Sequence, residues 1–250
     1  MSVHTDPSST DDAPLISNRS LFRLTAVIAA LAALTATISI GGRWYGQHMA
    51  LGGHTTSTEI FNIKIGKDTI ALAANTIRTR EQRRSGSQER ADLYLTWPDL
   101  QGYSDEQKAH FNATSGPGSL LFLQLSQATM SRDMSGRLEP IYALMFEGDP
   151  SPADHGLTMH RLRADSGYGN EVIYTAQRAG LPDYVVRCLV PAQGQAPTGG
   201  DCQRDIRLGR DLSVLYRFST TILKDWDHID AAISAFVETR LSDGTAGTGG

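Results

Sequence analysis

An uncharged and mostly apolar run of seventeen residues, from Leu24 to Ile40, limits the possible folds of this chain more than any other part. A transmembrane helix needs roughly 20 predominantly apolar residues, each adding about 1.5 Å to its length. Leu21 and Phe22 lengthen the run on the far side of Arg23, whose long side chain can reach the lipid headgroups. The sequence therefore predicts a single transmembrane helix that anchors the chain over residues 21–43.

Two other interpretations of the apolar run are weaker. A buried core helix normally keeps a polar stripe, whereas here only a few hydroxyl side chains interrupt the apolar residues. A cleaved signal peptide would use the small residues at Ala30–Ala32. Cleavage there would fall in the middle of the run and leave residues 33–40 as an exposed apolar start, so we favour an uncleaved anchor. The interrupting residues are Thr25, Thr35, Thr37 and Ser39.

The charges beside the run and the two cysteines predict its orientation. Arg19 and Arg23 lie at its N-terminal side and only Arg43 follows it, and positive residues favour the cytoplasmic side of a span. Cys188 and Cys202 both come after the span, and an even pair fits a disulfide formed in an oxidising compartment. We therefore expect a bacterial inner-membrane protein with a cytoplasmic N-terminus and a periplasmic C-terminal domain.

Composition divides the chain into four parts. Residues 1–20 are rich in Ser, Thr, Asp and Pro and predict a disordered cytoplasmic tail. The anchor at 21–43 is followed by residues 44–241, which are enough for one sizeable core. Residues 242–250 end in DGTAGTGG, which predicts a flexible tail.

Short runs of alternating apolar residues fill most of the long C-terminal part, and such runs predict β-strands. Gly66-Lys67-Asp68 separates the first two runs and predicts a hairpin turn. Helical patterns between the runs are scarce, which disfavours a doubly wound parallel sheet and favours an antiparallel one. The predicted strands are residues 59–65, 69–72, 92–97, 119–126, 156–163, 171–177, 184–190, 202–208 and 212–218.

One amphipathic helix is predicted over residues 222–241, where apolar residues recur every three or four positions. Thr220 or Thr221 can cap its start. The acidic residues near that start suit the positive end of the helix dipole, and this accounts for them: Asp225, Asp227 and Asp230. The fold class is therefore α+β, an N-terminal single transmembrane helix followed by a mainly antiparallel β-sheet domain with a C-terminal amphipathic helix.

Cys188 and Cys202 enclose thirteen residues, among them Gly194, Pro197, Gly199 and Gly200. A disulfide between them would close the base of a long hairpin loop and contribute about 3 kcal/mol in the chain-entropy model. The alternative is a redox or metal-binding pair, but the chain has no C-x-x-C and no histidine at ligand spacing. A structural disulfide is favoured.

One run of residues is strongly basic, although the chain as a whole is acidic. Five arginines and two glutamates fall within thirteen residues and give a local charge of +3, although the whole chain carries −4. Arginine forks suit phosphates and carboxylates, so the run predicts contact with lipid headgroups or an acidic partner. The competing interpretation is a solvated loop. The residues predicted to contact an anionic partner are Arg78, Arg80, Arg83 and Arg84.

Catalytic and cofactor motifs are missing from the sequence. There is no G-x-S-x-G, P-loop, G-x-G-x-x-G or H-E-x-x-H pattern, so we predict no catalytic residue, cofactor or metal. His155 and His160 are close in sequence but at the wrong interval for one strand face. The aromatic-rich turn from Trp97 to Tyr103 could anchor a partner, although such residues more often cover a core edge.

The layout resembles that of bitopic envelope proteins of Gram-negative bacteria in a general sense, and no particular family is indicated. The bilayer is one expected partner, and a protein or envelope polymer is the other. A pI near 6.0 argues against nucleic acid. We therefore expect a non-catalytic binding or envelope-assembly component. The alternative is an anchored hydrolase whose catalytic residues meet only in the fold.

Overall fold

A computed structural model describes residues 18–50, 53–112, 119–168, 170–190 and 194–242. The chain divides into two units, residues 1–52 and 53–250, and each is described by itself. Apart from residues 18–20 and 242, the tails predicted at 1–20 and 242–250 lie outside the described residues.

Helix α1 (Asn18–Ala50) forms the described part of the first unit and is longer than the predicted span. Its segment Leu21–Ser39 is the one described stretch of helix that is long and apolar enough to cross a membrane, and none of that stretch is buried. Thr25 and Thr35 donate their hydroxyls to backbone carbonyls four residues earlier, as Thr37 does. These three threonine hydroxyls are thus satisfied within the helix, as an apolar environment requires.

The second unit is built on an eight-stranded antiparallel sheet with the order β4-β5-β11-β10-β9-β8-β7-β6. This arrangement confirms the predicted α+β class with a mainly antiparallel sheet. Seven of its strands correspond to predicted strands, with ends shifted by a few residues. The strands are β4 (Arg90–Thr96), β5 (Leu120–Gln127), β6 (Phe146–Pro152), β7 (Thr158–Leu162), β8 (Glu171–Arg178), β9 (Leu181–Leu189), β10 (Cys202–Leu208) and β11 (Leu212–Phe218).

A second, three-stranded sheet contains the predicted hairpin. Strands β1 (Ile60–Ile65) and β2 (Asp68–Ala73) are antiparallel, and β3 (Gly86–Ser87) adds a short parallel pairing to β1. The chain end after the last helix continues this sheet, because Leu241 pairs with Ile70.

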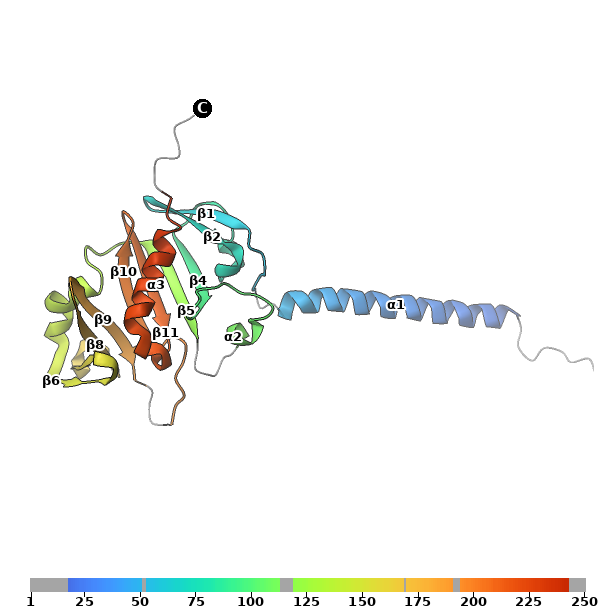
Figure 1. The fold of residues 1–250 in the computed structure, drawn as a ribbon. Helices are drawn as coiled ribbons and strands as arrows, with labels where there is room; N and C mark the ends of the chain where they lie inside the picture. Colours follow the sequence, from blue (N-terminus) through green and yellow to red (C-terminus); the bar gives the residue numbers. More distant parts are fainter. Residues whose placement is uncertain (1–17, 51–52, 113–118, 169, 191–193, 243–250) are drawn as a thin grey trace, which may run out of the picture. The chain divides into compact units, whose positions relative to one another are not determined.

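Helix α3 (Trp226–Glu238) lies against one face of the large sheet, across β10 and β11 in Figure 1. Its apolar residues, such as Ile229 and Ile233, join one core with alternate residues of the strands and with Ile63 and Leu72 of the small sheet. Because side chains alternate along a strand, this packing leaves the other set of side chains on the opposite face.

The predicted helix at 222–241 is only partly right. Residues Thr220–Asp225 form a 3₁₀ helix, and the α-helix begins at Trp226. Neither Thr220 nor Thr221 is the cap: the Ser219 hydroxyl accepts the N–H of Thr221 and caps the 3₁₀ helix.

The sequence patterns missed β3, β6 and the short helix α2 (Lys108–Asn112). Strand β6 reads FEGDPSP, is mostly exposed and has an irregular register with β7 between Glu147 and Ser151. Prolines and irregular registers of this kind are typical of edge strands, and β6 itself shows no apolar alternation. Short 3₁₀ and π segments from Ser135 to Met145 also carry no periodic signal.

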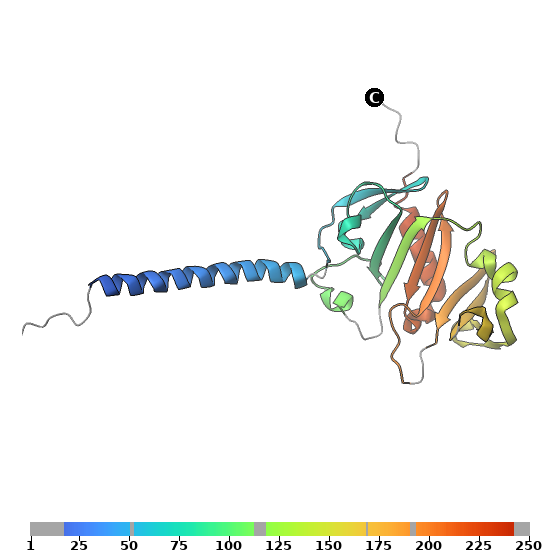
Figure 2. The same cartoon turned by 180° about the vertical axis from the view of Figure 1, so that it is seen from behind.

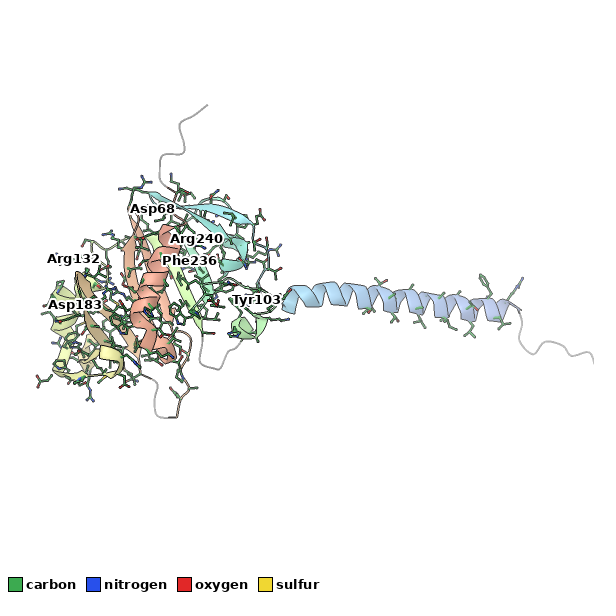
Figure 3. The ribbon with its side chains drawn as sticks, viewed as in Figure 1. Asp68, Tyr103, Arg132, Asp183, Phe236 and Arg240 are labelled. Carbon is green, nitrogen blue, oxygen red and sulfur yellow. A yellow bond between two sulfur atoms is a disulfide. The ribbon has the colours of Figure 1, made fainter. Side chains whose placement is uncertain are left out.

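Two hairpin turns lock the small sheet to the large one. The Asp68 carboxylate, labelled in Figure 3, accepts the backbone N–H groups of Arg210 and Asp211 in the β10–β11 turn. The Asp211 carboxylate in return accepts the N–H of Lys67. Gly209 has φ +59°, and a Cβ there would meet the Asp68 carboxylate at 2.7 Å, so this turn requires glycine for conformation and for space.

Candidate functional site

The face of the large sheet opposite α3 is the strongest candidate for a functional surface. Figure 2 shows it from behind, with β5, β11 and β10 uncovered by any described helix. We define the open face as the side chains that β4, β5, β11 and β10 place on this side in three cross-strand rows. The rows are Tyr94, Phe122, Arg217 and Gln203; Asp92, Gln124, Leu215 and Asp205; and Arg90, Ser126, Ser213 and Arg207.

Most of the open face is polar and partly exposed. Apart from Tyr94, which is buried, its side chains are half-buried or exposed. The carboxylates on it already have partners: Asp92 pairs with Arg90, and Asp205 pairs with Arg137 from the segment beyond β5. Burial raises the pKa of Asp205 above its usual value, and Arg137 offsets only part of that effect.

Two hollows lie along the open face and share Gln124 and Leu215. The smaller, of about 90 Å³, also contacts Arg78, Phe122 and Arg217. The larger, of about 210 Å³, runs between the strands and residues 128–137. Both are smaller than the roughly 300–1,000 Å³ of typical small-molecule pockets.

A third hollow, of about 500 Å³, adjoins the edge of this face. Only six residues line it, all from the segment 130–141, among them the exposed Met130 and Ile141. Its volume is within the range of small-molecule pockets, but none of the four strands of the open face contributes to its lining.

The four arginines predicted to meet an anionic partner are not equivalent. Arg78 is exposed and lies at the open face, with its guanidinium 5.6 Å from the centre of the Phe122 ring. Arg80 and Arg84 are also exposed but contact neither hollow. Arg83 is half-buried and donates to the backbone carbonyls of Gly53 and Ile77, which ties it to the interior.

An aromatic cluster closes the open face beyond β4. His54 stacks on Tyr103 with ring centres 4.7 Å apart, and its Nδ1 lies 2.7 Å from the Tyr94 hydroxyl. Phe111 packs edge-on against both tyrosines. Burial raises the pKa of Tyr94 to about 12, and burial together with Arg83 lowers the pKa of His54. These residues are therefore neutral near pH 7.

The two aromatic ends of the turn from Trp97 to Tyr103 pack against the domain, although residues between them are exposed. The Trp97 Nε1 donates to the Asp225 carboxylate at 3.1 Å, and Tyr103 is fully buried. Both aromatics therefore take the role of covering the core, which the sequence had favoured over an anchor for a partner.

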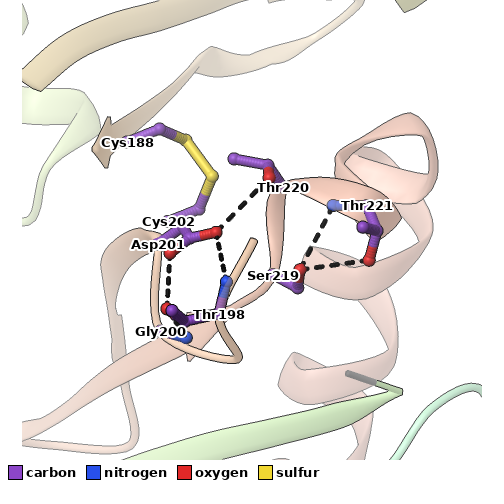
Figure 4. Close-up of a disulfide and its surroundings, with 8 residues drawn as sticks. All are labelled: Cys188, Thr198, Gly200, Asp201, Cys202, Ser219, Thr220 and Thr221. Carbon is purple, nitrogen blue, oxygen red and sulfur yellow. Dashed lines mark hydrogen bonds between the residues drawn. A yellow bond between two sulfur atoms is a disulfide. The ribbon is translucent and has the colours of Figure 1, made fainter. Parts of the chain in front are cut away.

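Cys188 and Cys202 form a disulfide with an S–S distance of 2.06 Å (Figure 4). The two residues are directly paired on β9 and β10, with Cα atoms 4.0 Å apart. The loop that they close is further tied by the Asp201 carboxylate, which accepts from the backbone N–H and hydroxyl of Thr198 and from the hydroxyl of Thr220.

Strands β9 and β10 pair at only two positions, next to the disulfide, and then diverge. Residues 133–137 fill the gap: the Met134 N–H donates to the Asp205 carbonyl, and the Ser135 hydroxyl donates to the Asp183 carbonyl. Arg204 crosses the same gap and donates to the Val185 carbonyl at 2.9 Å. Asp133 and Arg137 of this insertion line the hollow of about 210 Å³ and so border the open face beside β10.

Sequence reasoning missed a buried ionic network next to this insertion. Asp230 on α3 accepts from Arg204, Arg178 and Tyr216, and Arg204 is only 2% exposed. The helix dipole, to which the sequence analysis attributed Asp230, therefore does not by itself account for this residue. An arginine at an apolar position of β10 was the available signal, because the alternation there assigns Arg204 to the buried face.

His155 and His160 do not come together in a catalytic arrangement. His160 hydrogen-bonds the Thr175 hydroxyl at 2.9 Å and stacks on Phe146, and His155 lies in the turn before β7. No carboxylate hydrogen-bonds either histidine in the described parts of the chain. The same parts contain no group of three or more His, Cys, Asp or Glu side chains that could hold a metal.

Comparisons with known proteins show a fold but no family. No family profile matches the sequence, and no curated protein matches it. An immunity protein of the Stenotrophomonas maltophilia type IV secretion system has a similar structure, with a TM-score of 0.51 and 16% identity over 76% of this chain and 96% of that one. The Neisseria meningitidis iron-regulated outer membrane lipoprotein FrpD gives a TM-score of 0.44 and 11% identity over 74% and 95%. At these identities the first similarity concerns the fold alone, and the second is too weak to support an argument.

Proposed function

We propose that this chain is a single-pass membrane protein whose α+β domain binds another protein through the open face. The observation that carries the proposal is the face itself. Four strands present polar, partly exposed side chains there, uncovered by any described helix, beside hollows of about 90 and 210 Å³. A broad surface with small hollows suits contact with a protein better than it suits an enclosed small molecule.

The location that we propose is a bacterial inner membrane, with residues 21–43 as the anchor and residues 44–241 as a periplasmic domain. The exposed apolar segment of α1 supports the anchor. The disulfide supports an oxidising compartment for the domain, because such bonds are rare in reducing compartments. Residues 1–20 would then be cytoplasmic.

A non-catalytic, envelope-related role agrees with this arrangement. The similarity in fold to an immunity protein of a secretion system supports such a role in general terms and leaves the partner open. An anchored hydrolase was the alternative, and no grouping of the described residues favours it.

Photocrosslinking in intact cells tests the proposal. A photoreactive phenylalanine analogue would replace Gln124 or Ser213 on the open face, and Ala235, exposed on α3, would serve as the control position. We expect a discrete light-dependent adduct from the two open-face positions and none from Ala235, with the bound protein identified by mass spectrometry.

Adducts from Ala235 equal to those from the open face would contradict the proposal, because the crosslinked protein would then contact the open face no more than it contacts α3. The absence of any adduct from both Gln124 and Ser213, in cells where the variants are present at normal levels, would also contradict it.

A further inference from the structure

Phe122 is flanked by two arginines on the open face. Arg217 is its direct cross-strand neighbour on β11, and Arg78 holds its guanidinium 5.6 Å from the ring centre. Both arginines contact the hollow of about 90 Å³, with Leu215 as a second apolar contact. Two arginines and two partly exposed apolar side chains therefore line one hollow, and the Phe122 ring is approached by Gly199 as well.

The positive charge of these two arginines is not balanced within the described parts of the chain. No carboxylate there lies within 4.0 Å of Arg78 or Arg217. Asp92 contacts the same hollow, but its carboxylate is occupied by Arg90 and by the Gln82 amide. Two like charges beside one ring repel each other, and an anion placed between them would relieve that repulsion.

The imbalance extends along the open face. Five arginines and three aspartates line the two smaller hollows, although the chain as a whole carries −4. Asp133 accepts the N–H of Gly136, and Asp205 pairs with Arg137, so the acidic groups are engaged locally. The arginines are Arg78, Arg132, Arg137, Arg207 and Arg217, and the aspartates are Asp92, Asp133 and Asp205.

We infer that the open face binds an acidic segment of a partner protein, with Arg78 and Arg217 receiving a carboxylate and Phe122 and Leu215 contacting an adjacent apolar side chain. This inference rests on the proposed function and names the chemistry of its partner. Guanidinium groups form directional, charge-assisted hydrogen bonds to carboxylates, and complementary charge determines which partner is accepted. Of the four arginines predicted to contact an anionic partner, Arg78 is the one that lines either of these two hollows.

Fluorescence anisotropy with a defined probe tests the inference on the full chain in phosphatidylcholine nanodiscs. The probe is a labelled glutamate-rich peptide with one central leucine. We expect Arg78→Gln with Arg217→Gln to weaken binding about tenfold or more, because charge-assisted hydrogen bonds are lost. Arg80→Gln with Arg84→Gln removes the same charge from exposed residues outside both hollows and should change binding less than about twofold.

Charge reversal gives a second measurement that does not depend on loss of binding. Arg78→Glu with Arg217→Glu should transfer the preference to a lysine-rich peptide of the same length. Near-ultraviolet circular dichroism should match wild type in each variant, since both side chains are exposed.

Three results would overturn the inference. Equal weakening by the two double variants would mean that only overall charge matters. Unchanged peptide binding in the Arg78 and Arg217 variant would exclude the site. Binding to phosphatidylglycerol vesicles that needs Arg78 and Arg217, without peptide binding, would show a lipid surface instead.

The crosslinking experiment separates this inference from the proposed function. If the Gln124 adduct forms equally well in the variant with Arg78→Gln and Arg217→Gln, the open face still binds a protein, but these arginines do not recognise an acidic segment of it. If no adduct forms in wild type, the proposed function fails whatever the peptide does.

Discussion

Arg83 differs from its neighbours in the basic run because its guanidinium is used inside the domain. Its Nη2 donates to the carbonyls of Gly53 and Ile77, and its Nε also donates to Ile77. Burial lowers its pKa, although Tyr94 and Glu81 oppose that effect. One side chain thus ties the start of the domain to the segment before β4.

Replacing Arg83 should therefore affect stability, whereas replacing its neighbour should not. We expect Arg83→Gln to lower the free energy of unfolding by about 1–2 kcal/mol, because the partly buried Ile77 carbonyl and the exposed Gly53 carbonyl lose a charged donor. Arg84→Gln should change it by less than about 0.5 kcal/mol. Urea unfolding of the full chain in detergent measures both, and equal effects would show that Arg83 is an ordinary surface residue.

Asp230 is the acceptor at the centre of the buried network. Arg204 and Arg178 reach it from β10 and β8, and the Tyr216 hydroxyl donates to it from β11 at 2.7 Å. These donors lower the pKa of Asp230 despite its burial. The carboxylate therefore stays charged in the folded protein to a lower pH than in the unfolded chain.

Asp230→Asn should cost about 3–5 kcal/mol at pH 7, because it leaves the buried Arg204 and the partly buried Arg178 without their carboxylate. Asp227→Asn, on the exposed side of the same helix, should cost less than about 1 kcal/mol. Chemical unfolding monitored by circular dichroism measures the difference. A loss below about 1 kcal/mol in Asp230→Asn would mean that the network contributes little.

The same carboxylate predicts a pH dependence. Since its folded-state pKa is lowered, its stabilisation is complete above the unfolded value of about 3.9 and is lost as the pH falls through the folded value. Wild type should therefore lose more stability between pH 5 and pH 3 than Asp230→Asn does. Asp205 acts in the opposite sense because burial raises its pKa, so it does not explain an acid-induced loss.

At the scale of elements, the junction of β9 and β10 decides how the large sheet is completed. The strands pair only at Cys188–Cys202 and Arg187–Gln203, and residues 133–137 enter the gap beyond. The disulfide therefore joins the two halves of the sheet at the junction where they have only two paired positions. It is part of the frame behind the open face.

Removing both cysteines should lower the free energy of unfolding by about 3 kcal/mol, the value expected for closing a loop of this length. We expect Cys188→Ser with Cys202→Ser to show this loss in urea unfolding and to be insensitive to added reductant. Wild type treated with reductant should approach the variant. If reductant leaves wild type unchanged, the cysteines are not joined in the isolated protein.

At the scale of the whole molecule, the apolar segment of α1 makes a prediction about both termini. If that segment is the membrane anchor that we propose, it separates the two termini, and a reporter active only outside the cytoplasm should be active when fused beyond Leu241. The same reporter inserted before Leu21 should be silent. Activity at the N-terminal site alone would reverse the orientation, and release of a shortened chain from the membrane would indicate cleavage of a signal peptide.

Local patterns were sufficient to predict most of the elements. The apolar run from Leu24 to Ile40 is helical, and alternating runs such as 202–208 are strands. The spacing of apolar residues along the chain is enough to indicate which side chains are removed from water. The pairing of Cys188 with Cys202 was also predicted, since they are the chain's two cysteines. Strand β6 escaped prediction because an exposed edge has no apolar period to detect.

The sequence by itself therefore determined the apolar helix, the alternation of the strands and the cysteine pair, each of which depends on residue types near one another in the chain. Only the tertiary structure decided that Arg78 joins Arg217 beside Phe122, that Arg83 turns inward and that Asp230 meets Arg204. The pairing of Arg217 with Phe122 depends on strand register between distant segments, where a shift of one residue would move every side chain to the other face. The positions of Arg83 and Asp230 depend on how a loop and a helix pack against the strands. The candidate site follows from that register, because the buried face is set by packing against α3 and the remaining side chains form the open face.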